Sequence, residues 1–533
     1  MRQFDLPGRS PAYATSGMAA TSHPRATLAA LEVLRDGGNA VDAAVTAVAV
    51  LSVVEPGMTG IAGDCFALYA PAGGGPNGET VIGYNGSGRA PAAATVDRLR
   101  EQGVMKLEPT SVHTVTVPGA IEAWARLAGD FGTRDLGRLL APAIELAEAG
   151  YPTQPRVAWD TFRFTDKLAG NEAARALFLV DGKAPPAGTL LCQPKLAATL
   201  RAVAEGGPAA FYEGPVAEAM VRSLNALGGL HTVDDFAARG GDYVAPVSTR
   251  YRDVEILECP PNGQGFVALI LLNILEGFDL ASLDPDGAER LHLEIEAARL
   301  AYADRDSYVF DHIPDRAGLD PFLSKEYAAG RRRLIDPDRA MAADAVISLR
   351  PESNTTYLCV VDVDGNAISL INSLFAAFGS GIACPETGVV FQNRGLGFSL
   401  DPASANAIGP RKRPVHTIMP GMMLRDGQVE MPFGVMGGQY QPYGHAHFLT
   451  NLVDYGMDPQ AALDNARLFA NAGNIEVESG ITAAAIAGLE ARGHTIVPAP
   501  APHGGGQAIR IDRARGVLVG GSDPRKDGCA MGF

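Results

Sequence analysis

The sequence has few cysteines, no strongly basic segment and no long apolar run. Six cysteines are scattered over 533 residues without any C-x-x-C pair, and a chain of this length can bury a large core without disulfides. We therefore expect reduced, buried thiols. Lys and Arg number 44 against 60 Asp and Glu, for a formal net charge of -16, and no basic cluster offers a footprint for a phosphate backbone. Nucleic acid is not expected as a partner.

Membrane-spanning and secretory patterns are missing as well. The longest apolar runs, 43–54 and 266–275, are shorter than the roughly 20 residues that a membrane-spanning helix needs. Residues 1–22 have no apolar core behind a basic start, so they lack the pattern of a secretory signal. With 47% apolar and 20% charged residues, the composition is that of an ordinary folded protein. A cytoplasmic enzyme without a membrane partner is the simplest expectation.

Apolar periodicity predicts a layered α/β fold. Residues 40–54 are apolar on nearly every face, which predicts a helix that is buried on all sides. The patterns at 65–69 and within 355–373 indicate strands, and the latter pair is expected to be antiparallel. Further helices are expected at 27–35, 120–150, 194–205, 215–227 and 290–308.

The segment 355–373 has the pattern of a β-hairpin. Strand-like residues flank an Asp364-Gly365 pair that suits a tight turn. If the turn is centred there, the numbers of facing residues sum to about 729, which places Ser373 or Leu374 opposite Thr355. A hydroxyl is therefore expected to face Thr355. By itself, a threonine at the start of a strand is more often a β-former than a nucleophile.

Several sequence blocks point to a more specific interpretation. The first is ATSHPRATLAALEVLRDGGNAVDAAV near the N-terminus, and others are CPPNG at 259–263, SNTTY at 353–357 with VVDVDGNAISL after it, Gly437-Gly438, and GSDPR at 521–525. In these blocks and their order, the chain resembles the gamma-glutamyltranspeptidases over nearly its whole length. The resemblance implies an N-terminal nucleophile hydrolase with a four-layer αββα sandwich of stacked, mainly antiparallel sheets.

The resemblance also implies self-cleavage between Asn354 and Thr355. The products would be a large subunit, 1–354, and a small subunit, 355–533, which together form one αββα unit. Before cleavage the hydroxyl of Thr355 can attack its own preceding carbonyl, and afterwards the freed α-amine, with a pKa of about 8, can act as the base for that hydroxyl. The fragments are expected to remain associated, because the hairpin needs helices of the large fragment to cover it.

Other catalytic roles follow from the same resemblance. Ser373 falls where the family has a threonine whose hydroxyl supports the nucleophile. Gly437 and Gly438 match the glycines whose backbone N–H groups form the oxyanion hole, although without the resemblance the two glycines favour a plain turn. No cofactor and no metal are expected.

The substrate-binding positions depart from the family pattern. The place of the family's arginine falls at Ser87, with Arg89 two residues away as a substitute. Phe375 replaces an asparagine, and the paired serines before the oxyanion glycines become His416 and Thr417. His416 can be interpreted as a hydrogen-bond donor in the pocket or as a core histidine in a tight turn.

Two of the departures change the charge of the pocket. Arg394 stands where the family has a polar anchor, and Gly397 stands where it has the aspartate that pairs with the substrate ammonium. A guanidinium favours a carboxylate and repels an ammonium. This pattern is similar to the oxamate amidohydrolase and acylase-like branches of the family. A structural ion pair remains the alternative for Arg394.

We therefore expect an amidohydrolase that cleaves a small carboxylate-bearing amide, of the oxamate type, through a threonine acyl-enzyme. A gamma-glutamyltransferase or glutathione hydrolase, a beta-lactam side-chain acylase and a non-catalytic scaffold remain alternatives. A homo-oligomer of the processed heterodimer is also compatible with the sequence. His445 and His447 would lie on one strand face, but without a third ligand nearby they give a zinc site little support.

Overall fold

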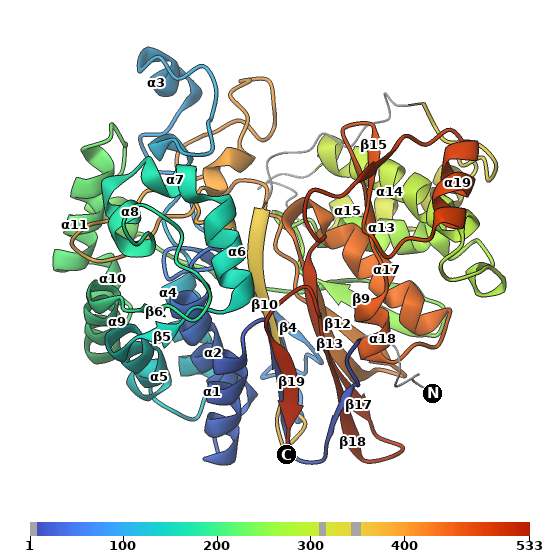
Figure 1. Ribbon diagram of the computed structural model, residues 1–533, viewed down its shortest axis with the longest axis horizontal. Helices are drawn as coiled ribbons and strands as arrows, with labels where there is room; N and C mark the ends of the chain where they lie inside the picture. Colours follow the sequence, from blue (N-terminus) through green and yellow to red (C-terminus); the bar gives the residue numbers. More distant parts are fainter. Residues whose placement is uncertain (1–7, 309–315, 343–352) are drawn as a thin grey trace.

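Two seven-stranded sheets lie face to face at the centre of the molecule (Figure 1). The computed structural model describes residues 8–308, 316–342 and 353–533. Sheet 1 has the order β1 (Ala12–Ala14), β18 (Val517–Ser522), β17 (Gly505–Asp512), β13 (Gln428–Met436), β12 (Gly421–Arg425), β9 (Val254–Glu258) and β8 (Val247–Tyr251). Sheet 2 has the order β19 (Cys529–Gly532), β2 (Met18–Thr21), β10 (Ser353–Val361), β11 (Ala367–Ala376), β3 (Asp64–Ala70), β4 (Ile82–Gly86) and β7 (Asp242–Val244). Neighbouring strands are antiparallel throughout both sheets.

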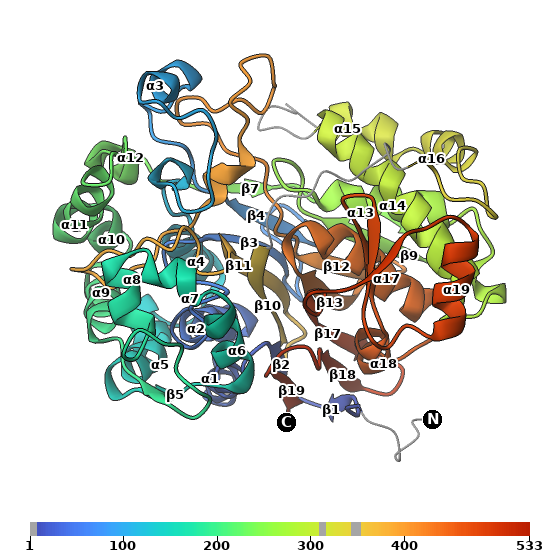
Figure 2. The same cartoon turned by 45° about the horizontal axis from the view of Figure 1, so that its top comes forward.

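Helices cover the outer face of each sheet (Figures 1 and 2). One apolar cluster joins sheet 2 to α1 (Pro24–Arg35), α2 (Ala40–Val54), α4 (Ala120–Phe131), α5 (Leu136–Ala149), α9 (Pro194–Gly206), α10 (Ala209–Tyr212), α11 (Gly214–Asn225) and α12 (Val233–Ala237). A second joins sheet 1 to α13 (Gly265–Leu275), α14 (Ala288–Tyr308), α15 (Arg316–Leu323), α16 (Lys325–Arg332), α17 (Gln441–Val453), α18 (Pro459–Asp464) and α19 (Ala483–Ala491). A third cluster fills the space between the sheets. The expected αββα sandwich is confirmed.

Smaller elements complete the molecule. Helices α3 (Val96–Glu101), α7 (Thr165–Ala169) and α8 (Glu172–Phe178) pack in two smaller clusters with the segments that follow β11, and α6 (Pro155–Arg163) precedes α7. Two minor sheets consist of β14 (Leu468–Asn471), β15 (Asn474–Val477) and β16 (Ile496–Pro498), and of β5 (Tyr151–Pro152) and β6 (Leu190–Leu191). None of the described helices is both long enough and apolar enough to cross a membrane.

Helix α2 confirms the expectation of a helix buried on all sides. Asn39 caps its N-terminus by accepting hydrogen bonds from the backbone N–H groups of Val41 and Asp42, and the Asp42 carboxylate accepts one from the N–H of Asn39. This reciprocal capping satisfies donors that the first turn leaves without partners. Every residue of the helix is buried, between sheet 2 and the outer helices.

The predicted hairpin is present as β10 and β11, in the middle of sheet 2. Its turn is held by Asp362, whose Oδ1 accepts hydrogen bonds from the backbone N–H groups of Asp364 and Asn366. Thr356 pairs with Asn372, and a bulge in β11, where Ser373 and Leu374 lie opposite Thr355, then shifts the pairing by one residue. The register therefore agrees with the sequence-based sum to within one residue.

Three expectations need correction. His445 and His447 lie on helix α17, not on a strand, because Pro442 occupies its first turn and suits a helix start. The helix expected at 120–150 is two helices, α4 and α5, separated by a turn in which Asp135 caps α5. Four cysteines are buried, but Cys192 is exposed and Cys529 is half-buried.

Candidate active site

Thr355, Ser373 and Asp64 lie in a row across β10, β11 and β3, at one end of sheet 2. Oγ1 of Thr355 is 3.1 Å from Oγ of Ser373, and Ser373 is the pairing partner of Asp64. All three are buried. Residues two positions further along these strands belong to the core between the sheets: Tyr357, Ile371 and Phe66. Because side chains alternate along a strand, the row also faces sheet 1.

Arg394 reaches this row from the short 3-10 helix η3 (Arg394–Gly397). Its Nη1 donates to Oγ1 of Thr417 over 2.8 Å, and its Nη2 donates to Oγ of Ser373 over 3.3 Å. The guanidinium carbon lies 4.3 Å from the centre of the Phe375 ring, a cation–π geometry. Phe375 also donates its backbone N–H to Oγ of Ser373. The structure thus brings Thr355, Ser373, Phe375, Arg394 and Thr417 together.

No described carboxylate contacts the guanidinium of Arg394. The side chain is fully buried, and among the described residues its Nε–H has no hydrogen-bond acceptor. Burial lowers the pKa of Arg394 to about 9, and the nearby charge of Asp64 opposes that shift only in part. A buried cation without a contacting anion is costly in a folded protein. The arrangement is therefore suited to receive an anionic ligand.

Asp64 connects three segments around the site. Its Oδ1 accepts hydrogen bonds from the backbone N–H of Gly88 and from Nε2 of Gln392, both over 2.9 Å. Its Oδ2 lies 3.0 Å from Nε2 of His416. Sequence analysis did not single out Asp64, and the one signal for it is weak: a carboxylate that begins an otherwise apolar strand.

His416 lies in the site but has no free ring nitrogen. Its Nε2–H donates to Asp64, and its Nδ1 accepts the backbone N–H of Ile418 over 3.3 Å. Burial and, next, the charge of Arg394 lower the pKa of His416 to about 3, so the ring is neutral. These contacts agree with the interpretation of His416 as a satisfied core histidine, and they leave no donor for a substrate.

The Gly437-Gly438 turn is connected to β10 and to the segment of Thr417. Gly437 has φ 125° and Gly438 has φ 58°, in the region that favours glycine. The following 3-10 helix η4 (Gly438–Tyr440) packs against β10. Nε2 of Gln264, another residue that the sequence analysis did not single out, donates to the carbonyls of both Thr417 and Gly438 over 2.9 Å. The turn is thus tied to the residues that contact Arg394, and its oxyanion role stays a prediction.

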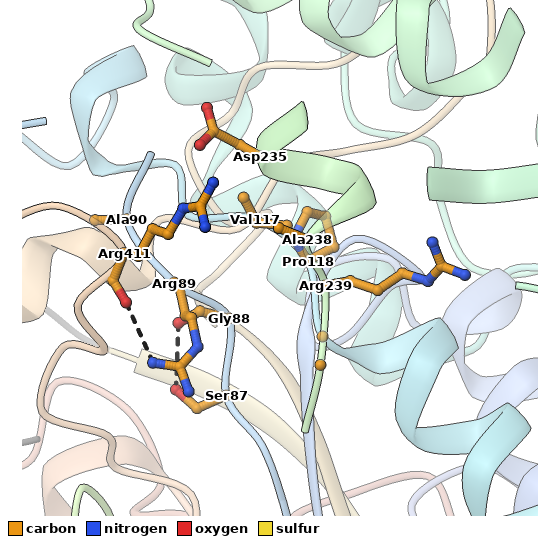
Figure 3. Close-up of a pocket in the computed structure, with 12 residues that line it drawn as sticks. Ser87, Gly88, Arg89, Ala90, Val117, Pro118, Asp235, Ala238, Arg239 and Arg411 are labelled. Carbon is orange, nitrogen blue, oxygen red and sulfur yellow. Dashed lines mark hydrogen bonds between the residues drawn. The ribbon is translucent and has the colours of Figure 1, made fainter. Parts of the chain in front are cut away.

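Arg89 lies at a different place. It lines a pocket together with Arg411, to whose carbonyl its Nη1 donates over 3.2 Å (Figure 3). Its Nη2 is 3.8 Å from Asp242. Neither Thr355 nor Arg394 lines this pocket. The substrate-binding role of Arg89 stays a prediction without support from these contacts. Asn354, on the other side of the expected cleavage site, pairs through its backbone with Phe375, and its side chain lies outside the described residues.

The imidazoles on α17 are paired with buried carboxylates. Nδ1 of His445 lies 2.7 Å from Glu258, and Nδ1 of His447 lies 2.8 Å from Glu294. Among the described residues, one group has ligand atoms close enough to hold a metal ion: His292, Glu296 and His494. In that group the two rings hydrogen-bond each other, and the carboxylate binds Arg299 and the backbone N–H of Met341. These contacts account for the group as a structural cluster.

Comparisons with known proteins agree with this geometry. The sequence model described as Gamma-glutamyltranspeptidase matches residues 26–533. The glutathione hydrolase-like YwrD proenzyme of Bacillus subtilis is 37% identical over 534 residues, which cover 97% of this chain and 99% of the relative. The oxamate amidohydrolase proenzyme of Klebsiella pneumoniae is 34% identical over 533 residues, again 97% and 99% of the two chains. The crystal structure of cephalosporin acylase from Bacillus halodurans is similar with a TM-score of 0.91 and 39% identity, over 100% of this chain and 99% of that one.

Proposed function

Because the chain belongs to the gamma-glutamyltranspeptidase family of autoprocessing amidohydrolases, we propose that it hydrolyses amides of small carboxylate-bearing compounds, of the oxamate type, with Thr355 as the nucleophile. The observation that carries the proposal is the buried guanidinium of Arg394, which contacts Ser373 and Thr417 but no described carboxylate. A substrate carboxylate would supply the missing anion.

Self-cleavage between Asn354 and Thr355 would produce fragments 1–354 and 355–533. The Thr355 hydroxyl attacks the preceding carbonyl, and breakage of the peptide C–N bond frees the α-amine and leaves an ester. Water then hydrolyses that ester, which gives the Asn354 carboxylate and restores the Thr355 hydroxyl. In sheet 2, strands from the two fragments alternate, with β2 and β3 of the large fragment on either side of the β10–β11 hairpin. Separation of the fragments would break that sheet, so we expect them to remain associated.

In turnover, the α-amine of Thr355 takes the hydroxyl proton while the oxygen attacks the substrate carbonyl. The tetrahedral intermediate collapses to an acyl-enzyme, and the departing nitrogen receives the proton, so that oxamate would release ammonia. Water, activated by the same amine, hydrolyses the ester and restores the hydroxyl. Backbone N–H groups of the Gly437-Gly438 turn are the proposed donors to the oxyanion.

Ser373 supports this chemistry by its hydrogen bonds. Its Oγ accepts from the backbone N–H of Phe375 over 2.8 Å and from Nη2 of Arg394 over 3.3 Å. The same Oγ lies 3.1 Å from Oγ1 of Thr355, a contact in which either hydroxyl can donate. When negative charge develops on the nucleophile, Ser373 becomes the donor. Such a donor stabilises negative charge that develops on the nucleophile.

The geometry at Gly397 argues against gamma-glutamyl substrates. A Cβ atom there would lie 2.8 Å from the carbonyl oxygen of Val415, so a side chain would require the backbone to move. The position at which the family carries the aspartate for the substrate ammonium therefore has no room for one. Arg394 would in addition repel that ammonium.

Steady-state kinetics on three substrates tests the proposal. We expect kcat/KM to be higher for oxamate, whose turnover is measured by ammonia release, than for gamma-glutamyl anilide. It should also be higher than for oxamide, the neutral analogue of nearly the same shape. Arg394→Met should remove the preference for oxamate over oxamide. Better turnover of gamma-glutamyl anilide by the wild type would contradict the proposed substrate class.

An acylase that acts on a larger amide is a second candidate. The full-length similarity to a cephalosporin acylase, with a TM-score of 0.91, favours it. The same site would serve, provided that the acyl group carries a carboxylate for Arg394. Turnover of glutaryl cephalosporin derivatives in preference to oxamate would identify this activity.

A further inference from the structure

We propose that Asp64 is a positioning residue for Arg394: it holds the segments that carry Arg394 and Thr417, and it provides a fixed negative charge near the guanidinium. This inference rests on the proposed function, in which Arg394 binds the substrate carboxylate. Asp64 opens β3 directly opposite Ser373 and is fully buried.

Asp64 is hydrogen-bonded to the segment that carries Arg394 and to the segment that carries its acceptor, Thr417. Gln392, which donates its amide N–H to Oδ1, lies two residues before Arg394. His416, which donates its ring N–H to Oδ2, is bonded covalently to Thr417, the residue whose hydroxyl accepts from Arg394. A shift of the Asp64 carboxylate would therefore move Arg394 and its acceptor at the same time.

The charges of Asp64 and Arg394 are close but not paired. All three groups that donate to Asp64 are neutral: a backbone N–H, an amide, and the neutral ring of His416. The charge of Asp64 acts on Arg394, yet the two form no ion pair. An ion pair with Asp64 would occupy the N–H donors of the guanidinium. A carboxylate that is near but not in contact favours the charged form and leaves those donors available to a substrate carboxylate.

The row across sheet 2 gives this separation a structural basis. Ser373 stands between Thr355 and Asp64 on neighbouring strands, and its hydroxyl accepts from Arg394. Arg394 thus contacts Ser373 in the middle of the row, while Asp64 at the end of the row accepts hydrogen bonds from neutral donors. Nucleophile, supporting hydroxyl and anion site are fixed by a single set of strand pairings.

The test compares Asp64→Asn with a matched control, Asp42→Asn. Asp42 is also fully buried and accepts several hydrogen bonds, from the backbone N–H and hydroxyl of Thr133 among others, but it caps α2 on the outer side of sheet 2. For Asp64→Asn we expect the KM for oxamate to rise about tenfold or more, with kcat changed by less than about threefold. The preference for oxamate over oxamide should fall accordingly. Asp42→Asn should lower thermal stability and leave that preference unchanged.

The outcomes separate the two proposals. If Asp64→Asn keeps the wild-type preference for oxamate, Asp64 has no positioning role, and the function of Arg394 stands. If the wild type itself does not prefer oxamate, the proposed function fails, and this inference fails with it. Should Asp64→Asn not fold, Gln392→Met removes one donor to Asp64 and keeps the charge. About a threefold loss of preference is then expected, and an unchanged preference overturns the inference.

Discussion

Arg290 and Arg394 are both completely buried, and both stack on an aromatic ring, yet their surroundings differ in one respect. Arg290, on α14, forms an ion pair with Glu294 at 3.0 Å and donates to Oγ1 of Thr450. Arg394 donates to two hydroxyls and contacts no described carboxylate. Burial lowers both pKa values. For Arg290 the charge of Glu294, its hydrogen bond and the neighbouring Tyr455 and Tyr443 together outweigh burial and raise the pKa, whereas the pKa of Arg394 falls to about 9.

Burial therefore does not distinguish the structural charge of Arg290 from the proposed binding charge of Arg394. The distinction lies in whether the protein itself supplies the opposite charge. Where it does, the pair is part of the fold and its loss leaves an unpaired ion. Where no described group supplies it, the buried charge lacks a contacting counter-charge, which an anionic ligand can provide.

The largest expected effect is on stability, from Arg290→Met. The change leaves the Glu294 carboxylate buried without its cation, and we expect the free energy of unfolding to fall by about 3–5 kcal/mol. Denaturant unfolding in an uncleaved Thr355→Ala background measures it. The oxamate preference of the cleaved enzyme should not change. A stability loss below about 1 kcal/mol would remove the contrast between the two arginines.

Arg394→Met should have the opposite profile. We expect the free energy of unfolding to change by less than about 1 kcal/mol, because no buried carboxylate loses its partner. The kcat/KM for oxamate should fall about 100-fold, which corresponds to the loss of a charged hydrogen bond worth about 2–3 kcal/mol. Turnover of oxamide is the internal control. A stability loss as large as that of Arg290→Met would instead indicate a structural ion.

The pH dependence provides a smaller and independent effect. With a pKa of about 9, Arg394 carries its charge below that pH and loses it as the pH rises further. Binding of a carboxylate is therefore complete below pH 9 and weakens above it, so the KM for oxamate should rise about tenfold per pH unit there. The KM for oxamide should not follow. An oxamate KM that stays flat to pH 10 would contradict the low pKa.

The smallest expected effect comes from the rings beneath the two arginines. Phe375→Leu removes the cation–π contact with Arg394, and we expect kcat/KM for oxamate to fall about fivefold, or about 1 kcal/mol. Tyr455→Leu, which removes the corresponding ring from Arg290, should leave kinetics unchanged. If the two changes lowered kcat/KM equally, the ring beside Arg394 would have no specific role in substrate binding.

Local sequence patterns predicted much of the fold. The hairpin register followed from a turn at Asp364-Gly365 and from the period of two along a strand. It predicted Ser373 or Leu374 opposite Thr355, and the hydroxyl of Ser373 lies 3.1 Å from that of Thr355. The buried helix α2 followed from its apolar faces. The strand expected at His445 was wrong, because two histidines at spacing two carry no period and the helix start at Pro442 decides the structure there.

The environment of the site could not be obtained from local patterns. Asp64 meets Gln392 and His416 only after residues more than 300 positions apart are brought together. Arg394 had two sequence-based interpretations, an ion pair or an anion site, and only the folded arrangement shows that no described carboxylate reaches it. At Gly397, only the structure shows that the carbonyl of Val415 lies too close for a side chain.

The role of Thr355 is tested most directly by the intact mass of the purified protein, beside that of the Thr355→Ala variant. We predict that the wild type consists of two fragments, one that ends at Asn354 and one that begins at Thr355, and that the variant is a single, inactive chain. A wild-type protein that hydrolyses oxamate at full rate while it remains one uncut chain would contradict the account, because Thr355 would then have no free α-amine to act as its base.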